Sequence, residues 1–341
     1  LMTRTDIRLA LPSKGVLQQE AMALLAECGL TIKKSNPRQY KATIPEMPGV
    51  TVLFQRPGDI VVGVREGSID FGITGLDIIT EKGNINGDEP ILIIHEALGF
   101  GACTLNLAVP EAVPSHTMAD LRRWAQELAE NGRSLRIATK FPLTTGQFLQ
   151  ANQIMPHKLI DAEGTLEIAP DIGFADLIAD LVSSGTTLRD NHLRQLEDGL
   201  ILRSEAALIA NKQALQTRPA VRAIARQLLE YIEAHLRALG SYLIITNMHG
   251  KTPETIAALM AERPFIGGLQ GPTIANIVSP DGGDNNLFSV SIVVAKKDLV
   301  KAIAELRAIG GSGVIVSPIA YIFEEEPARY RAMLAELEIK D

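Results

Sequence analysis

Short apolar runs alternate with helix-spaced apolar positions from the start of the chain. Ile7–Leu11 is predicted to be a strand, and the apolar positions within Leu17–Cys28 recur with the spacing of one helix face. The same pattern predicts strands at Val50–Phe54 and Phe71–Thr74, with a helix at Asp59–Glu66 between them. This strand–helix rhythm is typical of a parallel sheet covered by helices.

The rhythm restarts after Gly99 and predicts a second α/β lobe. Its expected strands are Thr104–Val109, Leu135–Ala138 and Leu166–Ala169, and its expected helices are Met118–Asn131, Gly146–Asn152, Phe174–Val182 and Thr186–His192. Gly199–Ser204 and Ala207–Ala210 are then predicted to return to the first lobe as strands. A chain that crosses twice between two lobes favours a cleft, where small molecules commonly bind.

The last third of the chain predicts a separate α/β unit. Arg218–Leu239 has amphipathic helical spacing and is closed by Gly240. The expected elements that follow are strand Tyr242–Thr246, helix Pro253–Met260, strands Thr273–Val278 and Phe288–Val294, helix Asp298–Ile309 and strand Val314–Ile319. This βαββαβ order is ferredoxin-like. The charged tail Glu324–Asp341 is expected to carry an amphipathic helix.

Composition narrows the class of protein. Of the 341 residues, 46% are apolar and 21% charged, as in soluble globular proteins. Only 4% are aromatic and the formal net charge is −7, which argues against nucleic acid as a partner. Apolar runs such as Ile91–Ile94 are far shorter than the ~20 residues that span a bilayer, so no membrane partner is expected. Cys28 and Cys103 show no metal-ligand spacing and no disulfide framework, which fits the cytoplasm.

Two acids precede a loop rich in hydroxyl groups. If Phe174–Val182 is a helix, Asp176 and Asp180 lie four residues apart on one face, either simply solvated or facing a ligand's sugar hydroxyls or divalent cation. Ser183-Ser184-Gly185-Thr186-Thr187 follows. Its glycine permits close backbone approach, and its N–H and hydroxyl groups can bind an anion or simply form an N-cap turn. Acids followed by such a loop suit ribose 5-phosphate.

One segment runs from Glu167-Ile-Ala-Pro through Gly173-Phe-Ala-Asp176 and Asp180 to Thr187-Leu188. It resembles the phosphoribosyl-pyrophosphate motif of the ATP phosphoribosyltransferases, which start histidine biosynthesis. The resemblance extends over nearly the whole chain. Its other segments are Leu11-Pro-Ser-Lys14-Gly15-Val-Leu17, Gln55-Arg56-Pro-Gly-Asp59-Ile60, Asp70-Phe-Gly72-Ile-Thr-Gly75 and Ile137-Ala-Thr-Lys140-Phe-Pro142. The C-terminal part resembles the regulatory domain of the family's long form.

The resemblance implies an α/β fold: a two-lobed, periplasmic-binding-protein-like catalytic core and a ferredoxin-like regulatory domain. Lobe I would be residues 1–98 with a return segment at about 199–220, lobe II residues 99–198, and the regulatory domain residues 240–341. The implied reaction transfers phosphoribosyl from phosphoribosyl pyrophosphate to N1 of the adenine of ATP, releasing pyrophosphate with Mg²⁺ present. Histidine is the implied inhibitor, and a homo-oligomer, hexamer or dimer, the implied assembly.

The same resemblance assigns site residues. Lys14, Arg38 and Arg56 would act on the phosphates of both substrates. ATP would be bound by Lys14, Gly15, Asp70, Gly72, Thr74 and Gly75. Phosphoribosyl pyrophosphate would be bound by Glu167, Asp176, Asp180, Ser183, Ser184, Gly185, Thr186 and Thr187, with Asp176 and Asp180 as the metal ligands.

The chain departs from the family pattern in two places. Leu143–Phe148 carries no Lys or Arg where family members commonly have a basic group, so a phosphate contact is either missing or supplied elsewhere, with Lys140 as one candidate. The turn-rich segment Ser279–Asn286 and the extended tail differ from a compact regulatory domain.

Two alternatives remain at this point. A two-lobed chain also suits a solute-binding or effector-sensing module, although a signal peptide and a DNA-binding helix pair are not evident in the sequence. A phosphoribosyltransferase of the nucleotide-salvage type usually places two adjacent acids directly after an apolar strand. The expected helical spacing of Asp176 and Asp180 disfavours that class.

Overall fold

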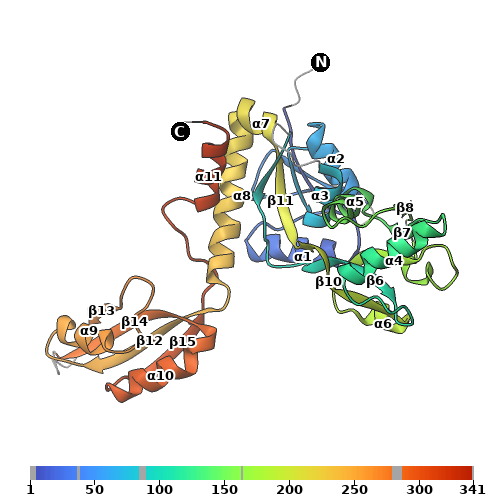
Figure 1. Ribbon diagram of the computed structural model, residues 1–341. Helices are drawn as coiled ribbons and strands as arrows, with labels where there is room; N and C mark the ends of the chain where they lie inside the picture. The colour runs from blue at the N-terminus through green and yellow to red at the C-terminus, as the bar shows by residue number, and fades with distance from the viewer. Residues whose placement is uncertain (1–4, 37–38, 84–89, 163, 279–285, 340–341) are drawn as a thin grey trace. The chain divides into compact units, whose positions relative to one another are not determined.

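The computed structural model describes residues 5–36, 39–83, 90–162, 164–278 and 286–339. The chain forms two compact units (Figure 1). Unit 1 comprises Leu1–Leu229 and Ala328–Asp341, and unit 2 comprises Glu230–Pro327.

The first sheet of unit 1 has six strands in the order β2-β3-β1-β4-β11-β5. The central strands β3, β1 and β4 run parallel, and β11 is antiparallel to both of its neighbours. The strands are β1 (Ile7–Pro12), β2 (Lys41–Thr43), β3 (Val50–Gln55), β4 (Phe71–Gly75), β5 (Ile91–His95) and β11 (Ala206–Asn211). All five residues of β4 are buried, as expected for a parallel strand covered on both faces.

Three helices follow the parallel strands of the first sheet. They are α1 (Gly15–Glu27), α2 (Pro57–Arg65) and α3 (Leu76–Gly83). Ile60, Val61 and Val64 of α2 pack on the sheet. Gly72 allows this close contact, because a Cβ atom there would lie 2.4 Å from Cγ2 of Ile60. Gly72 is therefore a packing residue, not a ligand-facing one.

The second sheet of unit 1 has the strand order β10-β6-β9-β7-β8. Strands β8, β7 and β9 are parallel, and β6 is antiparallel to β9 and β10. The strands are β6 (Cys103–Pro110), β7 (Leu135–Thr139), β8 (His157–Asp161), β9 (Leu177–Val182) and β10 (Leu193–Ser204). Helices α4 (Met118–Glu130), α5 (Pro142–Ala151) and α6 (Thr186–Asp190) connect them, with a 3₁₀ turn at Leu166–Ile168.

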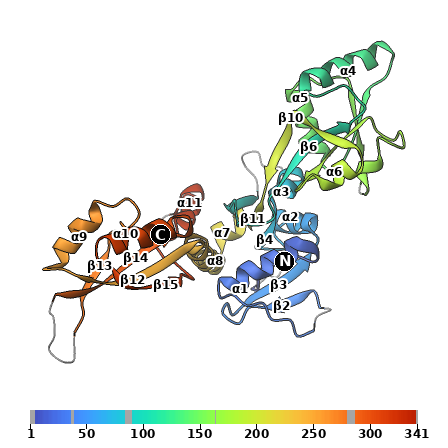
Figure 2. The same cartoon turned by 90° about the horizontal axis from the view of Figure 1, so that it is seen from below.

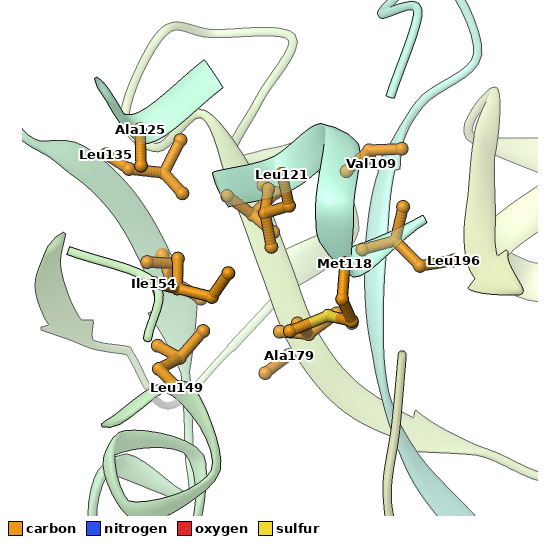
Figure 3. Close-up of a cluster of buried hydrophobic side chains, with 12 residues drawn as sticks. Val109, Met118, Leu121, Ala125, Leu135, Leu149, Ile154, Ala179 and Leu196 are labelled. Atoms are coloured by element: carbon orange, nitrogen blue, oxygen red, sulfur yellow. The ribbon is translucent and has the colours of Figure 1, made fainter. Parts of the chain in front are cut away.

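The core of the second lobe lies between α4, α5 and the sheet. Figure 3 shows Leu121 and Ala125 of α4 gathered with Leu149, Ile154 and other buried side chains. A capping box fixes the start of α4, because Thr117 accepts the N–H of Asp120 and the Asp120 carboxylate accepts the N–H of Thr117.

Two neighbouring chain segments join the two sheets (Figure 2). One leads from β5 to β6 and the other from β10 to β11. Leu98 donates its N–H to the carbonyl of Ala206 (2.9 Å), and Ala206 donates to the carbonyl of Phe100 (3.0 Å). The Gly99 N–H donates to the carboxylate of Glu205. The two crossing segments are thus hydrogen-bonded to each other where the chain passes between the sheets, and this pair of segments is called the hinge below.

The sequence after β11 forms α7 (Lys212–Thr217), α8 (Pro219–Ala238) and, at the end of the chain, α11 (Ala328–Glu336). The tail helix belongs to unit 1, since Tyr330 is buried and lies under the guanidinium of Arg226. Arg329 pairs with Glu96, just after β5, at 2.7 Å.

Unit 2 is a four-stranded antiparallel sheet in the order β13-β14-β12-β15. Its elements are β12 (Ser241–His249), α9 (Pro253–Ala261), β13 (Thr273–Asn276), β14 (Leu287–Ala295), a 3₁₀ turn (Lys296–Asp298), α10 (Leu299–Ala308) and β15 (Ser312–Pro318). Ile256 and Leu306, one from each helix, pack against Ile244 and Val290 of the sheet. The predicted βαββαβ order is confirmed.

Three local predictions are wrong. Residues 177–182, expected within a helix, form the strand β9, and Leu166–Ala169, expected to be a strand, contains a 3₁₀ turn. Gly199–Ser204 does not return to the first sheet, since β10 pairs with β6 up to Ser204.

The predicted turn-rich segment is not among the described residues over positions 279–285. In the described part of the chain, no helix combines the length and apolar character needed to cross a bilayer.

Candidate functional site

The carboxyl edge of the first sheet carries two exposed cations at helix starts. Lys14 is the N-cap residue of α1 and Arg56 that of α2, and neither side chain caps its helix. Backbone N–H groups at helix starts attract anions, and the adjacent cations strengthen that attraction. In open α/β sheets ligands bind outside this edge. The structure therefore places the predicted residues Lys14 and Arg56 where phosphates can bind.

Small residues line the same edge. Gly15 has φ = +80°, and no atom lies within 4 Å of the position a Cβ would occupy, so this backbone is open to a ligand. Thr74 is fully buried, and its Oγ1 finds no hydrogen-bond partner among the described residues. A Cβ atom on Gly75 would lie 2.2 Å from Oδ1 of Asp77, so this glycine makes room for a neighbouring acid.

The hydroxyl loop, Ser183–Thr187, leaves the carboxyl edge of the second sheet between β9 and α6. Gly185 has φ = +71°, a conformation that favours glycine. The Ser184 hydroxyl donates to Oγ1 of Thr186 at 3.1 Å. The Ser183, Ser184, Thr186 and Thr187 side chains are exposed, and only Gly185 is half-buried. The loop thus offers its hydroxyl groups to solvent or to a ligand.

Arg189 is a site residue that the sequence motif did not reveal. Its Nη2 donates to Oγ1 of Thr186 at 3.2 Å, and its Nη1 lies 3.5 Å from the carbonyl oxygen of Ser184. The guanidinium therefore folds back over the loop from the first turns of α6. Its position three residues after Thr186 was the available signal, since residues at i and i+3 share a helix face.

Asp180 lies in β9, three residues before the hydroxyl loop begins. Burial raises the pKa of the Asp180 carboxyl, and the charge of Glu167 adds to this, whereas the Leu181 N–H and Lys140 oppose it. Asp180 accepts the N–H of Leu181 at 2.8 Å. The carboxyl of Asp180 is thus subject to the charges of both Glu167 and Lys140.

A cavity of about 620 Å³ lies between the two edges. It is lined by residues from both sheets: Val16, Leu17, Glu20, Pro57, Gly75, Asp77, Ile78, Gly101, Ala102, Cys103, Leu181 and Ser183. Most of these side chains are apolar or small, which suits a flat aromatic ring. Glu167 instead lines a separate cavity of about 460 Å³ with Pro110–Ala112 and Asp190–Leu193.

Asp77, Ser204 and Cys103 form a cluster at the cavity that sequence reasoning missed. The Ser204 hydroxyl donates to Oδ1 of Asp77 at 2.6 Å and accepts the Asp77 N–H at 2.9 Å. Burial raises the pKa of Asp77, against the hydrogen bonds from Ser204 and from backbone N–H groups. Burial, followed by the Asp77 charge, raises the pKa of Cys103. Their separation in the chain gave no local signal.

Asp70 and Asp176, both predicted site residues, lie at the amino edges of the first and second sheets, respectively, and not at the carboxyl edges. Asp70 is fully buried, accepts the Arg8 N–H at 2.8 Å and pairs with Arg218 at 2.6 Å. Asp176 accepts the Arg136 N–H at 2.8 Å and pairs with its guanidinium at 2.9 Å. Both acids therefore join neighbouring strands at the amino edges, away from Thr74 and from the hydroxyl loop.

The predicted metal pair does not form. In a strand the four-residue separation of Asp176 and Asp180 corresponds to roughly 13 Å, not to one turn of helix. Among the described residues no three His, Cys, Asp or Glu side chains gather to hold a metal ion. Magnesium commonly takes one or two carboxylates and completes its shell with water and phosphate oxygens. Asp180 fits that mode, and Asp176 does not.

The departure at Leu143–Phe148 has a structural counterpart. Glu81 of α3 accepts the N–H groups of Leu143 (2.8 Å) and Thr144 (2.9 Å) and the Thr144 hydroxyl (2.8 Å). A carboxylate from the first lobe thus occupies the start of α5. Arg38 lies outside the described residues.

Comparison with known proteins decides the family. The model of the HisG family, described as ATP phosphoribosyltransferase, matches residues 56–234, and that of the HisG C-terminal domain matches residues 238–321. The chain belongs to the ATP phosphoribosyltransferase family. It is accordingly an enzyme of the pentosyltransferase class, with the long form's C-terminal domain.

Relatives in the ATP phosphoribosyltransferase family match along almost the whole chain. The chloroplastic ATP phosphoribosyltransferase 2 of Arabidopsis thaliana is 43% identical over 342 residues, covering 98% of this chain and 81% of the relative. The ATP phosphoribosyltransferase of Methanothermobacter thermautotrophicus is 36% identical, covering 93% and 99%. Among solved structures, the ATP phosphoribosyl transferase (HisG:HisZ) complex from Thermotoga maritima is 25% identical with a TM-score of 0.49, covering 67% of this chain and 98% of that one.

Proposed function

We propose that the chain converts ATP and 5-phosphoribosyl 1-pyrophosphate into N1-(5-phosphoribosyl)-ATP and pyrophosphate, the first step of histidine biosynthesis. The observation that carries the proposal is the cavity of about 620 Å³ between a cationic edge and a hydroxyl-lined edge. The adenine N1 attacks the ribose C1, and the bond from C1 to the pyrophosphate oxygen breaks with its electron pair on pyrophosphate. A site for this reaction must hold both partners in line and stabilise the charge of the leaving group.

The second sheet supplies the phosphoribosyl side of the proposed site. The hydroxyl loop binds the 5-phosphate, and Arg189, already directed onto that loop, adds a cation. Asp180 and Glu167 take the ribose hydroxyls. The raised pKa of Asp180 supports a hydrogen-bonding acid in this place, because a buried carboxyl gains from a polar partner.

The first sheet supplies the nucleotide side. Lys14 and Arg56 bind the pyrophosphate and the ATP phosphates beside the starts of α1 and α2. The apolar wall formed by Val16, Leu17 and Ile78 suits the adenine ring. Gly75 borders that space, and Thr74 precedes it in β4. Arg38 is proposed as a further phosphate contact. When bound, Mg²⁺ would neutralise phosphate charge, and we assign Asp180 as the protein group that would hold it.

The proposal is tested by incubating the protein with ATP, phosphoribosyl pyrophosphate and Mg²⁺, then measuring phosphoribosyl-ATP and pyrophosphate. Absence of both products, in an assay where a control enzyme works, rejects it. For the loop, Thr186→Val with Gly185→Ala should raise KM for phosphoribosyl pyrophosphate far more than KM for ATP. Alanine at Gly185 is strained at φ = +71°, and its Cβ would lie 3.3 Å from Nη1 of Arg189. Equal effects on both substrates would contradict the placement.

We further propose that unit 2 mediates feedback inhibition by histidine. The support is a separate βαββαβ unit with a cavity of about 450 Å³, which is bordered by Arg237 and Glu324, an ion pair at 3.6 Å. Removing residues 240–341 would also delete α11, which belongs to unit 1. Replacing residues 241–319 by a Gly/Ser linker retains that helix. Histidine should inhibit the full chain and not this variant; persistent inhibition would contradict the assignment.

A homo-oligomer, either a dimer or a hexamer, belongs to the same proposal and rests on the family assignment. Light scattering at assay concentration measures it directly, and a monomer would contradict it. The cytoplasm is the proposed compartment, supported by free thiols at Cys28 and Cys103.

A further inference from the structure

Helix α3 of the first lobe contacts α5 and β10 of the second. It begins directly after β4 and carries Asp77 and Glu81, four residues apart on one helix face. Both carboxylates bond to groups of the second lobe: Asp77 to Ser204 of β10, and Glu81 to the first turn of α5. Figure 1 shows α3 and α5 beside each other.

The two contacts differ in where they lie relative to the hinge. Ser204 is the last residue of β10, and the chain crosses to the first sheet immediately after it. A bond at the crossing itself restrains little rotation between the lobes. Glu81 lies about 6 Å further along α3, at 1.5 Å per residue, and it bonds to a helix away from the crossing. Glu81 is therefore placed to restrain the opening angle of the cleft.

The contact made by Glu81 also completes α5. The first N–H groups of a helix have no partner within it, and the N-cap residue Phe141 supplies no side-chain acceptor. The two oxygens of Glu81 accept the N–H groups of Leu143 and Thr144 as well as the Thr144 hydroxyl. A negative charge at a helix start is stabilised by the helix dipole. The bond between the lobes is thus a charge-assisted cap with three donors.

Helix α5 leads back to the proposed site. Residues Lys140 and Phe141 link β7 to α5, and β7 pairs with β9, the strand that ends in the hydroxyl loop. Fixing the start of α5 on α3 thereby fixes the carboxyl edge of the second sheet against that of the first.

We propose that Glu81 is a positioning residue for phosphoribosyl transfer: by capping α5 from the opposite lobe, it holds the two halves of the site at the separation that the reaction requires. This inference rests on the proposed function. In the proposed site ATP contacts mainly the first edge, whereas phosphoribosyl pyrophosphate contacts both, through its 5-phosphate at the hydroxyl loop and its pyrophosphate at Lys14 and Arg56. Binding of ATP therefore tolerates a wider cleft, whereas transfer from one edge to the other does not. Displacement of a reacting group by about 1 Å can cost about 100-fold in rate.

Glu81→Gln in the full chain tests the inference, because the amide keeps the shape of the side chain but loses its charge and one acceptor. We expect kcat to fall at least about ten-fold, with KM for ATP changing less than about three-fold. Hydrogen exchange at the Leu143 and Thr144 amides should accelerate. The matched control is Glu130→Gln, an exposed carboxylate of α4, which should retain wild-type kinetics.

A wild-type kcat in Glu81→Gln, after correction for the folded fraction, would overturn the inference, as would an increase in KM for ATP large enough to account for the lost kcat/KM. If Glu81→Gln does not fold, Thr144→Val removes a single donor at a buried position and is expected to lower kcat by about two- to five-fold. Unchanged kcat in that variant would likewise overturn it. Failure of the proposed function is separate, since the wild-type protein itself would then form no phosphoribosyl-ATP.

Discussion

The amino and carboxyl edges of the two sheets treat charge in opposite ways. At the amino edges, Asp70 and Asp176 each accept a backbone N–H from the neighbouring strand and pair with an arginine. At the carboxyl edges, Lys14 and Arg56 are exposed beside helix starts that their side chains do not cap. Charged side chains that pair with other groups of the fold stabilise the sheets. Cationic side chains beside helix N–H groups that have no side-chain cap are available to bind an anionic ligand. Residue type alone does not separate the two roles.

The largest effect expected from this comparison is on stability. Asp70→Asn should lower the free energy of unfolding by about 3 kcal/mol, because it leaves Arg218 without its charged partner at a fully buried site. KM for both substrates should stay at the wild-type value in the folded protein. Urea unfolding measures the loss, with the exposed Asp161→Asn as control, expected within about 0.5 kcal/mol. A raised KM for ATP without loss of stability would return Asp70 to the site.

A substitution at the carboxyl edge of the first sheet should change catalytic activity and leave stability unchanged. Arg56→Ala is expected to lower kcat by about 100- to 1,000-fold, close to 3 kcal/mol of transition-state stabilisation, because a donor to the developing charge is lost. Its melting temperature should barely change, since the side chain is exposed. Steady-state formation of phosphoribosyl-ATP measures this, and Arg263→Ala, an exposed arginine of unit 2, is the control. A stability loss with intact kcat would reverse the comparison at this edge.

A covered part of the carboxyl edge provides a pH test. His95 ends β5 and is buried beside the Glu96–Arg329 pair; burial, followed by the Arg329 charge, lowers its pKa to about 4, while Glu96 opposes this. Between pH 6.5 and 4 the unfolded chain binds a proton there that the folded chain does not, so stability falls as pH falls. The full effect is about 3 kcal/mol.

His95→Gln should therefore remove about 3 kcal/mol from the stability difference between pH 7 and pH 4. Urea midpoints of both proteins at the two pH values give the comparison. Parallel losses in the variant and the wild type would mean that His95 gains its proton in the folded state as readily as in the unfolded state.

The smallest expected effect is at the second amino edge. Asp176→Asn should cost about 1 to 2 kcal/mol, less than Asp70→Asn, because the guanidinium of Arg136 is one-third exposed. KM for phosphoribosyl pyrophosphate should not change. A ten-fold rise in that KM, with stability intact, would show that the motif position acts in binding after all.

Much of the fold could be predicted because its period-2 and period-3.6 patterns are clear. The βαββαβ order of unit 2 and the first strands and helices follow from local spacing. The helix predicted for residues 174–182 was wrong because β9 is buried on both faces. Leu177 and Ala179 pack on one side of the sheet, and Ile178 and Val182 pack on the other. Such a strand shows no alternation, and a helical spacing can be fitted to it.

The site was predictable only where its residues adjoin in sequence. The hydroxyl loop, Lys14 and Arg56 stand in short motifs that follow strands. Glu81 and Ser204 bond to partners far along the chain, and no local pattern marks them. Asp70 and Asp176 lie within the motifs, yet only the direction of their strands shows that they lie at the far edges.

The position of β11 has a consequence for biosynthesis of the protein. β11 lies between β4 and β5 in the first sheet, although the whole second sheet precedes it in the chain. A chain emerging from the ribosome therefore has every strand of the second sheet before the first can close. We expect the first sheet to remain incomplete, with unpaired backbone on β4 and β5, until residues 103–204 have been synthesised and β11 can pair with both strands. The first sheet is therefore begun first and completed last.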